Sequence, residues 1–262
     1  MSASNATAVP LKVTRKTLLI VAGVVFGLTL ISHIPAALLY SVFKPKDARL
    51  LVHGLQGPWS AGALSGISLN GRLVAQDLRW QLKPLQLLLG RAAVQLSGGG
   101  QIATLDGGIA TGLGGLRLSD FRFAAGLKSL AAAGGYAFVP VDGRLGGEIE
   151  KLVVKGGSLH YAAARLEAKN LAWTLARDPL LLGDFQAEIT TAPEAITALI
   201  TSPAGPLEAT GTAKLSPDKS YDVDILLKPK PGASEMLLNY MKTLGAPDPQ
   251  GFYRLRQRGK LP

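Results

Sequence analysis

The chain has 262 residues and a formal net charge of +10, with 28 lysines and arginines, 18 aspartates and glutamates, and no cysteine. The lack of cysteine excludes a disulfide scaffold, cysteine–zinc sites and thiol chemistry. The excess of basic residues is concentrated near the two ends of the chain, and the middle is nearly neutral. Because a nucleic-acid-binding protein spreads basic residues over its folded body, we do not expect a nucleic-acid partner.

An apolar segment lies near the N-terminus, where residues 17–43 contain no lysine, arginine, aspartate or glutamate. About 20 apolar residues span the hydrocarbon core of a bilayer as a helix, whereas the apolar region of a cleaved signal peptide has only about 7–15. We therefore predict an uncleaved transmembrane helix at 17–43, in contact with membrane lipid, between a tail at 1–16 and a domain at 44–262. Basic residues flank the segment on both sides, so the positive-inside rule does not decide the orientation, and the sequence as a whole only leans towards a cytoplasmic N-terminus.

Short segments that alternate apolar and polar residues make up much of the remaining chain. The clearest are 78–82, 171–175 and 221–227. Such alternation is typical of strands with one buried face. Pairs or triplets of glycine recur at 98–100, 107–108, 114–115, 146–147 and 156–157. At this spacing they predict tight turns, so the domain is predicted to be mainly β, with an antiparallel sheet.

One short helix is predicted near the C-terminus, at residues 233–245. Its apolar stripe consists of Leu237, Tyr240, Met241 and Leu244. Ser234 is suited to the N-cap position, and Gly245 is typical of a C-terminal stop. Because most surface helices bury such a stripe against their own fold, we expect this helix to pack on the edge of the sheet rather than bind a partner.

An internal repeat links two stretches that lie 93 residues apart. Residues 72–90 and 165–183 are identical at ten of nineteen positions without a gap, and Asp77 corresponds to Asn170. The repeat predicts a domain built from two similar units, at about 57–140 and 141–262. These units either stack as two sheets or continue a single sheet.

The predicted structural core of the repeat is a set of alternating large apolar residues. They are Leu78, Trp80, Leu82, Leu171, Trp173 and Leu175. The two tryptophans either pack in this core, which their alternation in phase with leucine favours, or line an apolar groove for an acyl chain.

Four features occur in a fixed order along nearly the whole chain. They are Pro35-Ala36 in the apolar segment, the turn Gly57-Pro58-Trp59-Ser60-Ala61-Gly62, the run Leu64-Ser65-Gly66 to Gly71 followed by 78–84 and 88–91, and the tail motifs at 247–248, 251–255 and 259–261. In this order and spacing the chain resembles the type II secretion system protein N family. The usual Gly-Thr-x-Trp turn of that family is replaced here by Gly57-Pro58-Trp59.

The resemblance implies a bacterial inner-membrane protein that crosses the membrane once. It places residues 1–16 in the cytoplasm and the β domain in the periplasm, which settles the orientation that charge alone leaves open. It also implies other type II secretion system proteins as partners, in the export of folded proteins across the outer membrane. The family offers no catalytic residues to carry over.

The residues themselves show no catalytic or metal-binding pattern. The three histidines, His33, His53 and His160, do not have the spacing of a metal-binding pair. No nucleophile elbow, phosphate-binding lysine loop or zincin motif occurs. The acidic pairs Glu148/Glu150 and Asp222/Asp224 are interpreted as solvent-facing strand residues. We therefore expect no enzyme activity, cofactor, metal or small-molecule substrate.

Two functional hypotheses follow. The first is a non-enzymatic accessory component of a type II secretion system, acting through protein–protein contacts of its periplasmic domain. The alternative is an envelope lipid-binding or lipid-transfer protein with an apolar β groove, suggested by the abundance of apolar over charged residues in the β domain. The basic residues of the tail are Arg254, Arg256, Arg258 and Lys260. They either contact an acidic partner or anionic lipid headgroups, or protect an edge strand by their charge.

Overall fold

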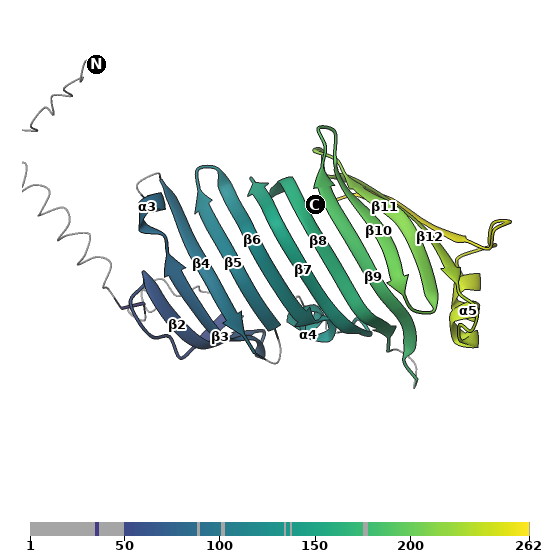
Figure 1. Ribbon diagram of the computed structural model, residues 1–262, viewed down its shortest axis with the longest axis horizontal. Coiled ribbons are helices and arrows are strands. Elements are labelled where there is room, and N and C mark those ends of the chain that lie inside the picture. The colour runs from purple at the N-terminus through teal and green to yellow at the C-terminus, as the bar shows by residue number, and fades with distance from the viewer. Residues whose placement is uncertain are drawn as a thin grey trace, which may run out of the picture.

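The computed structural model describes residues 35–36, 50–87, 90–100, 103–133, 135–136, 138–174 and 178–261. They form one 13-stranded sheet in which the strands follow one another in chain order, and every pair of neighbours is antiparallel (Figure 1). The prediction of a mainly β, antiparallel domain is confirmed. The sequence left open whether the repeat forms one sheet or two, and the structure has one.

The strands are β1 Leu50–His53, β2 Ala61–Leu69, β3 Arg72–Leu82, β4 Arg91–Gly99, β5 Ala103–Gly112, β6 Gly115–Gly126, β7 Val141–Lys155, β8 Ser158–Trp173, β9 Leu180–Thr191, β10 Ile196–Ala204, β11 Leu207–Leu215, β12 Ser220–Pro229 and β13 Tyr253–Lys260. Three helices accompany them: α3 Pro84–Leu87, α4 Leu127–Ala133 and α5 Glu235–Lys242. Both α4 and α5 lie at the same end of the strands, and α3 lies at the other (Figure 1).

The predicted transmembrane helix at 17–43 lies outside the described residues, apart from positions 35–36. Pro35 forms an isolated bridge with Pro58, and the Ala36 amide donates to the Gly57 carbonyl at 3.0 Å. Within the described ranges, no helix has the length and apolar character needed to cross a membrane.

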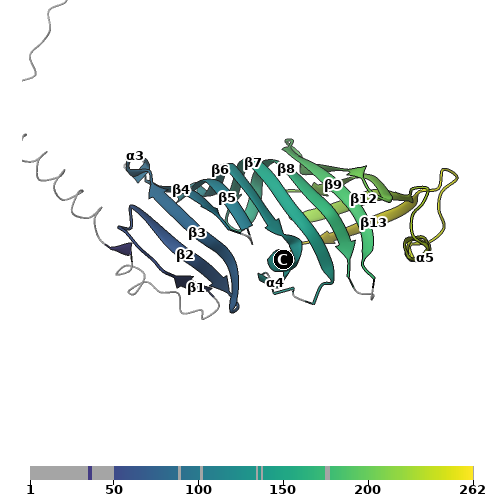
Figure 2. The ribbon, with the colours of Figure 1, turned by 60° about the horizontal axis from the view of Figure 1, so that its bottom comes forward.

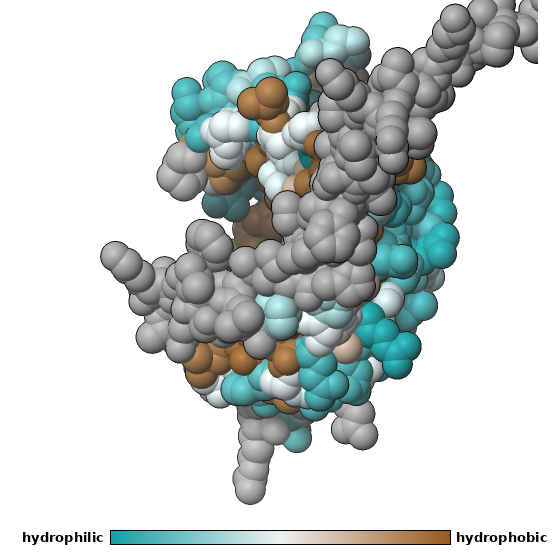
Figure 3. All heavy atoms as spheres, turned by 90° about the vertical axis from the view of Figure 1, so that its left-hand side faces the viewer, coloured by the Kyte–Doolittle hydropathy of each residue, from teal (hydrophilic) through white to brown (hydrophobic). Residues whose placement is uncertain are grey.

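The sheet is strongly curved. Figure 2 shows the C-terminal strands β12 and β13 turning back behind β8 and β9. Helix α4 contacts β6 and β7, between which it lies in the chain, and also β3. Seen along the long axis of the molecule, the sheet encloses a hollow that is open on one side (Figure 3). Brown, apolar residues lie in the depth of this hollow, and teal, hydrophilic residues cover the convex side.

Strand register explains why the two faces differ. One set of residues, here called the inner row, lies opposite one another on successive strands from β2 to β13. It consists of Leu64, Leu78, Gly98, Leu105, Phe123, Gly147, Leu166, Ala187, Ile200, Gly211, Ile225 and Leu255. All of these residues are apolar. Because successive side chains of a strand point to opposite faces, the residues next to this row lie on the other face.

That neighbouring set, here called the outer row, is mostly polar and charged. It consists of Ala63, Arg79, Ser97, Asp106, Arg122, Glu148, Arg165, Glu188, Leu199, Thr212, Asp224 and Arg256. From β5 to β9 the row alternates in sign from one strand to the next. Opposite charges that face each other across strands stabilise the pairing.

Two of the predicted glycine turns are wrong. Gly100, Gly114 and the pair 156–157 lie in connections between strands, Gly98 and Gly99 end β4, and Gly115 begins β6. In contrast, 107–108 lies within β5 and 146–147 within β7. A Cβ atom on Gly147 would lie 2.6 Å from Cδ2 of Leu166 and 2.8 Å from Cε1 of Phe123. Glycine is therefore present here because large apolar side chains from both neighbouring strands occupy the space above it.

The two copies of the repeat take similar local conformations but different places in the sheet. Asp77 and Asn170 both have a left-handed backbone, with φ of 52° at Asn170 and 50° at Asp77, a conformation that these two residue types tolerate best after glycine. The copies lie on β3 and β8. Since these strands are five apart in an antiparallel sheet, they run in opposite directions. The copies then diverge, because residues 84–87 form α3 whereas Leu180 begins β9.

The predicted C-terminal helix is confirmed as α5, with Ser234 as its N-cap. The Leu237 amide donates to the Ser234 Oγ at 3.2 Å. The helix ends earlier than predicted, at Lys242 with Thr243 as C-cap, so Gly245 does not end it. Tyr240 is 50% exposed and does not belong to the buried stripe.

Helix α5 packs against the sheet, as predicted. Leu237 and Met241 join Leu180 and Leu207 in a buried cluster, at the ends of β9 and β11. Half-buried residues around this cluster include Trp173, Leu227 and Tyr253. The best-sealed part of the apolar face is therefore the corner that α5 covers.

Candidate functional site

The inner row forms the floor of the hollow, and most of it is only half-buried. Leu78 is 5% exposed, whereas Leu255 at the edge is 40% exposed and the residues between are mainly intermediate. Among the described residues, Leu237 is the one large side chain with less than 2% of its surface accessible. A sheet normally buries its apolar face against a second layer. In the described part of the chain, only α4 and α5 provide such cover, at one end of the strands.

This face offers few hydrogen bonds to anything that lies on it. The inner row has no polar side chain, and the backbone groups of its strands are engaged in the sheet. Two polar side chains of this face, near the β1 edge, have partners within the protein. His53 Nε2 lies 2.9 Å from Ser68 Oγ, and Trp80 Nε1 donates to the Trp59 carbonyl at 2.9 Å.

The outer row carries ion pairs in the middle of the sheet. The Nε atom of Arg122 on β6 donates to Oε1 of Glu148 on β7 at 2.8 Å, and Nη2 does so at 2.6 Å. The hydrogen bond and charge of Glu148 raise the pKa of the Arg122 guanidinium. On the next pair of strands, Arg165 Nη2 lies 3.9 Å from Glu188 Oε1. These side chains are exposed, so the pairs fix register and solubility more than they add stability.

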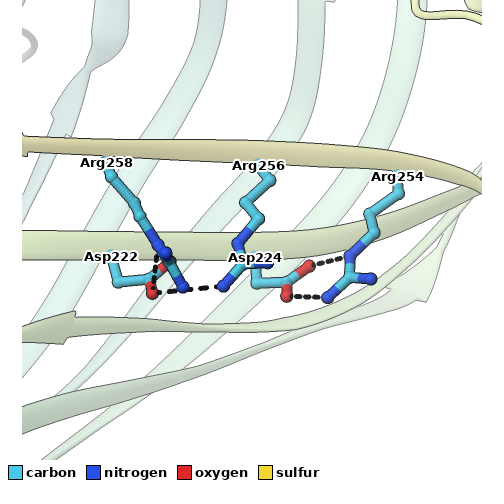
Figure 4. A network of polar contacts seen from close by, with 5 residues as sticks. All are labelled: Asp222, Asp224, Arg254, Arg256 and Arg258. Atoms are coloured by element: carbon cyan, nitrogen blue, oxygen red, sulfur yellow. Dashed lines mark hydrogen bonds and ion pairs between the residues drawn. The ribbon is translucent and has the colours of Figure 1, made fainter.

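A second charged network joins β12 and β13 (Figure 4). Arg254 donates from Nε to Asp224 Oδ1 at 2.8 Å and from Nη2 to Asp224 Oδ2. Arg258 donates from Nε to Asp222 Oδ2 at 2.8 Å, and Arg256 Nη2 lies 3.7 Å from the same oxygen. The hydrogen bond from Arg254 lowers the pKa of Asp224, and that of Arg254 is raised in turn.

The structure places the four predicted contact residues of the tail together, on the polar face of β13. This strand is the last of the sheet, with β12 as its neighbour. Lys260 Nζ lies 4.0 Å from Asp218 Oδ2, so each of the four basic residues has an acidic neighbour on or beside β12. This arrangement favours the interpretation of a charged edge strand, because much of the positive charge is offset within the protein.

The predicted core residues of the repeat that the structure describes lie on the apolar face, but in different surroundings. Leu78 is buried, and the Trp80 ring lies over Gly62, where a Cβ atom would come within 2.3 Å of it. Trp173 instead packs against the cluster under α5. Leu82 and Leu171 are half-buried, and Leu175 lies outside the described residues.

The described residues hold no cluster of three histidine, cysteine, aspartate or glutamate side chains that could bind a metal. His53 lies on β1, His160 is exposed on β8, and His33 lies outside the described residues. The acidic pair Asp222/Asp224 is engaged by arginines, as described above, and Glu148 is engaged by Arg122.

Comparison with known families decides the identity of the domain. The family model for type II secretion system protein N matches residues 48–256. The chain belongs to the type II secretion system protein N family. The match runs from just before β1 into β13, so the apolar and charged rows both belong to the family domain. Neither the curated proteins nor the solved structures contain a match to the chain.

Proposed function

We propose that the protein is a non-enzymatic accessory component of a type II secretion system, held in the bacterial inner membrane by residues 17–43. In this proposal residues 1–16 lie in the cytoplasm and the β domain lies in the periplasm. The domain acts through contacts with other secretion proteins. The observation that carries the proposal is the family match over residues 48–256. The uncharged stretch at 17–43 supports the membrane anchor, because its length suits a bilayer-spanning helix.

The polar, convex face is the surface that we propose for these contacts. Its outer row presents a fixed sequence of alternating charges from Asp106 to Glu188. Fixed charge patterns of this kind select partners and suppress wrong ones, while adding little affinity of their own.

Membrane topology is open to a direct test, because the chain contains no cysteine. The single-cysteine variants Ser2→Cys and Ala192→Cys place a thiol in the tail and in the exposed β9–β10 turn. A membrane-impermeant maleimide is expected to label Ala192→Cys in spheroplasts, and Ser2→Cys only after lysis. The reverse pattern would overturn the orientation.

The partnership is tested by purifying the tagged full-length chain from crosslinked membranes. We expect other type II secretion proteins to co-purify, and the untagged strain provides the background. A double charge reversal on the convex face, Arg122→Glu with Arg165→Glu, should lower their recovery. Recovery of no secretion protein from the unaltered chain would contradict the proposed function.

A further inference from the structure

The apolar floor of the hollow is continuous over nearly the whole sheet. The inner row crosses every strand from β2 to β13 without a polar side chain. Beyond the end covered by α4 and α5, no described element lies on it. An apolar surface of this extent marks a binding surface in a folded protein.

The chemistry of the floor selects the occupant. An extended polypeptide on this face would leave its amide and carbonyl groups without partners, at a cost for each buried group. A hydrocarbon chain carries no such groups and gains free energy in proportion to the area it buries. The floor therefore suits acyl chains better than an extended peptide.

The dimensions agree with this choice. The nine strands from β1 to β9, which lie before the sheet turns back, extend for about 40 Å along the hollow at a spacing of about 4.8 Å. The hydrocarbon core of a bilayer is about 30 Å thick and holds two layers of acyl chains, so one chain is about 15 Å long. At least two chains fit along this length, one after another.

The proposed membrane anchor would hold the sheet close to a source of lipid. The apolar stretch ends at Phe43, and the sheet begins at Leu50. Seven residues extend for at most about 25 Å, so a helix at 17–43 would keep β1 close to the membrane surface. Figure 3 views the molecule from the β1 side, and apolar residues are visible in the depth of the hollow from there.

We propose that the concave face of the sheet holds phospholipid acyl chains, which enter from the membrane at the β1 end. This inference rests on the membrane anchor of the proposed function, but not on any contact with secretion proteins. The charged convex face remains free for such contacts while lipid occupies the other side.

Site-specific photo-crosslinking in the full-length chain tests this proposal. The photoreactive residue p-benzoylphenylalanine is placed at Leu105 and Ile200 on the inner row, and at their outward-facing neighbours Asp106 and Thr201. Cells are labelled with radioactive phosphate and irradiated, and the chain is purified under denaturing conditions. We expect a radioactive phospholipid adduct at both inner positions and its loss to background at both outer positions.

A blocking variant tests the direction of entry. Leu166→Asp places a charge on the floor at β8, between Leu105 on β5 and Ile200 on β10. It should abolish the lipid adduct at Ile200 and leave the adduct at Leu105, whereas Arg165→Asp on the outer row should change neither. Circular dichroism of each purified variant checks that the strands are retained.

Other outcomes overturn the proposal. Equal adducts at inner and outer positions, or none at either inner position, would show that no lipid lies on the floor. A protein-sized adduct at Leu105 and Ile200 would identify a polypeptide as the occupant instead. If lipid adducts are absent while secretion proteins still co-purify, the lipid inference fails and the proposed function stands.

Discussion

The inner and outer rows lie side by side on the same strands, yet they meet their surroundings differently. On the outer row, Arg122 and Glu148 lie directly opposite each other and form an ion pair in contact with water. On the inner row, Phe123 and Leu166 lie over Gly147 and are only half-buried. The charged groups of the polar face thus pair with one another, whereas in the described part of the chain the apolar face is covered only at the end where α4 and α5 lie.

The largest effect is expected where α5 seals the apolar face. Leu237→Ala should lower the free energy of unfolding by about 3 kcal/mol, because it removes a fully buried side chain and leaves a cavity. Leu238 lies on the same helix and is 41% exposed, so Leu238→Ala is the matched control. Urea unfolding followed by circular dichroism measures both variants. Equal losses from the two would mean that α5 does not seal this corner.

A smaller effect is expected on the uncovered floor. Phe123→Ala should cost about 2 kcal/mol, less than the loss of a fully buried aromatic side chain, because Phe123 is only half-buried. The same urea titration measures it in lipid-free protein. A loss larger than that of Leu237→Ala would show that the floor is covered as well as the α5 corner.

The next largest effect on stability is expected at the N-cap of α5. Ser234→Ala should lower the free energy of unfolding by about 1 kcal/mol, because the Leu237 amide loses its acceptor. Ser234→Asp retains an acceptor and adds a favourable charge at the helix N-terminus, so it should restore the stability. Thermal unfolding measures both variants. Equal unfolding temperatures for Ser234→Ala and Ser234→Asp would contradict the role of Ser234 as N-cap.

The smallest effect is expected at the exposed pair of Arg254 and Asp224. The hydrogen bond from Arg254 lowers the pKa of Asp224 in the folded state. Its stabilising effect should therefore be complete above the unfolded carboxyl pKa of about 3.9, and be lost as the pH falls through the lower folded value.

Asp224→Asn should remove this part of the acid dependence of the urea midpoint, and high salt should weaken it in the unaltered chain. Because the guanidinium of Arg254 remains, the comparison isolates the carboxylate charge. An identical acid profile for both proteins would show that the pair contributes nothing to stability.

Local patterns predicted several strands and α5, but not the helices α3 and α4 or the arrangement of the strands. Alternation at 221–227 correctly predicted β12, and the stripe with Ser234 predicted α5. Gly107 and Gly147 were wrongly predicted to lie in turns, because the sequence alone does not distinguish a glycine in a strand from a glycine in a turn. Only the contacts of Gly147 with Phe123 and Leu166 distinguish the two, and those residues lie on neighbouring strands.

The two rows were not predictable for a similar reason. Asp106, Arg122, Glu148 and Arg165 are separated by many residues in the chain, so their alternation in sign becomes visible only with the register of the sheet. The partners of the acidic residues on β12 were not predictable for the same reason. Asp222 and Asp224 were interpreted as solvent-facing residues, and their arginine partners lie 30 or more residues further along. Curvature, which turns the apolar face into a hollow, has no local signal at all.

Strand order has a consequence for how the domain assembles. Because every strand pairs with the one before it, each new hairpin needs only the strand already in place and no distant part of the chain. Nearest-neighbour pairing keeps loop-closure costs low, which favours rapid folding despite the large sheet. The domain can therefore be built progressively from its N-terminal edge while the rest of the polypeptide is still being synthesised.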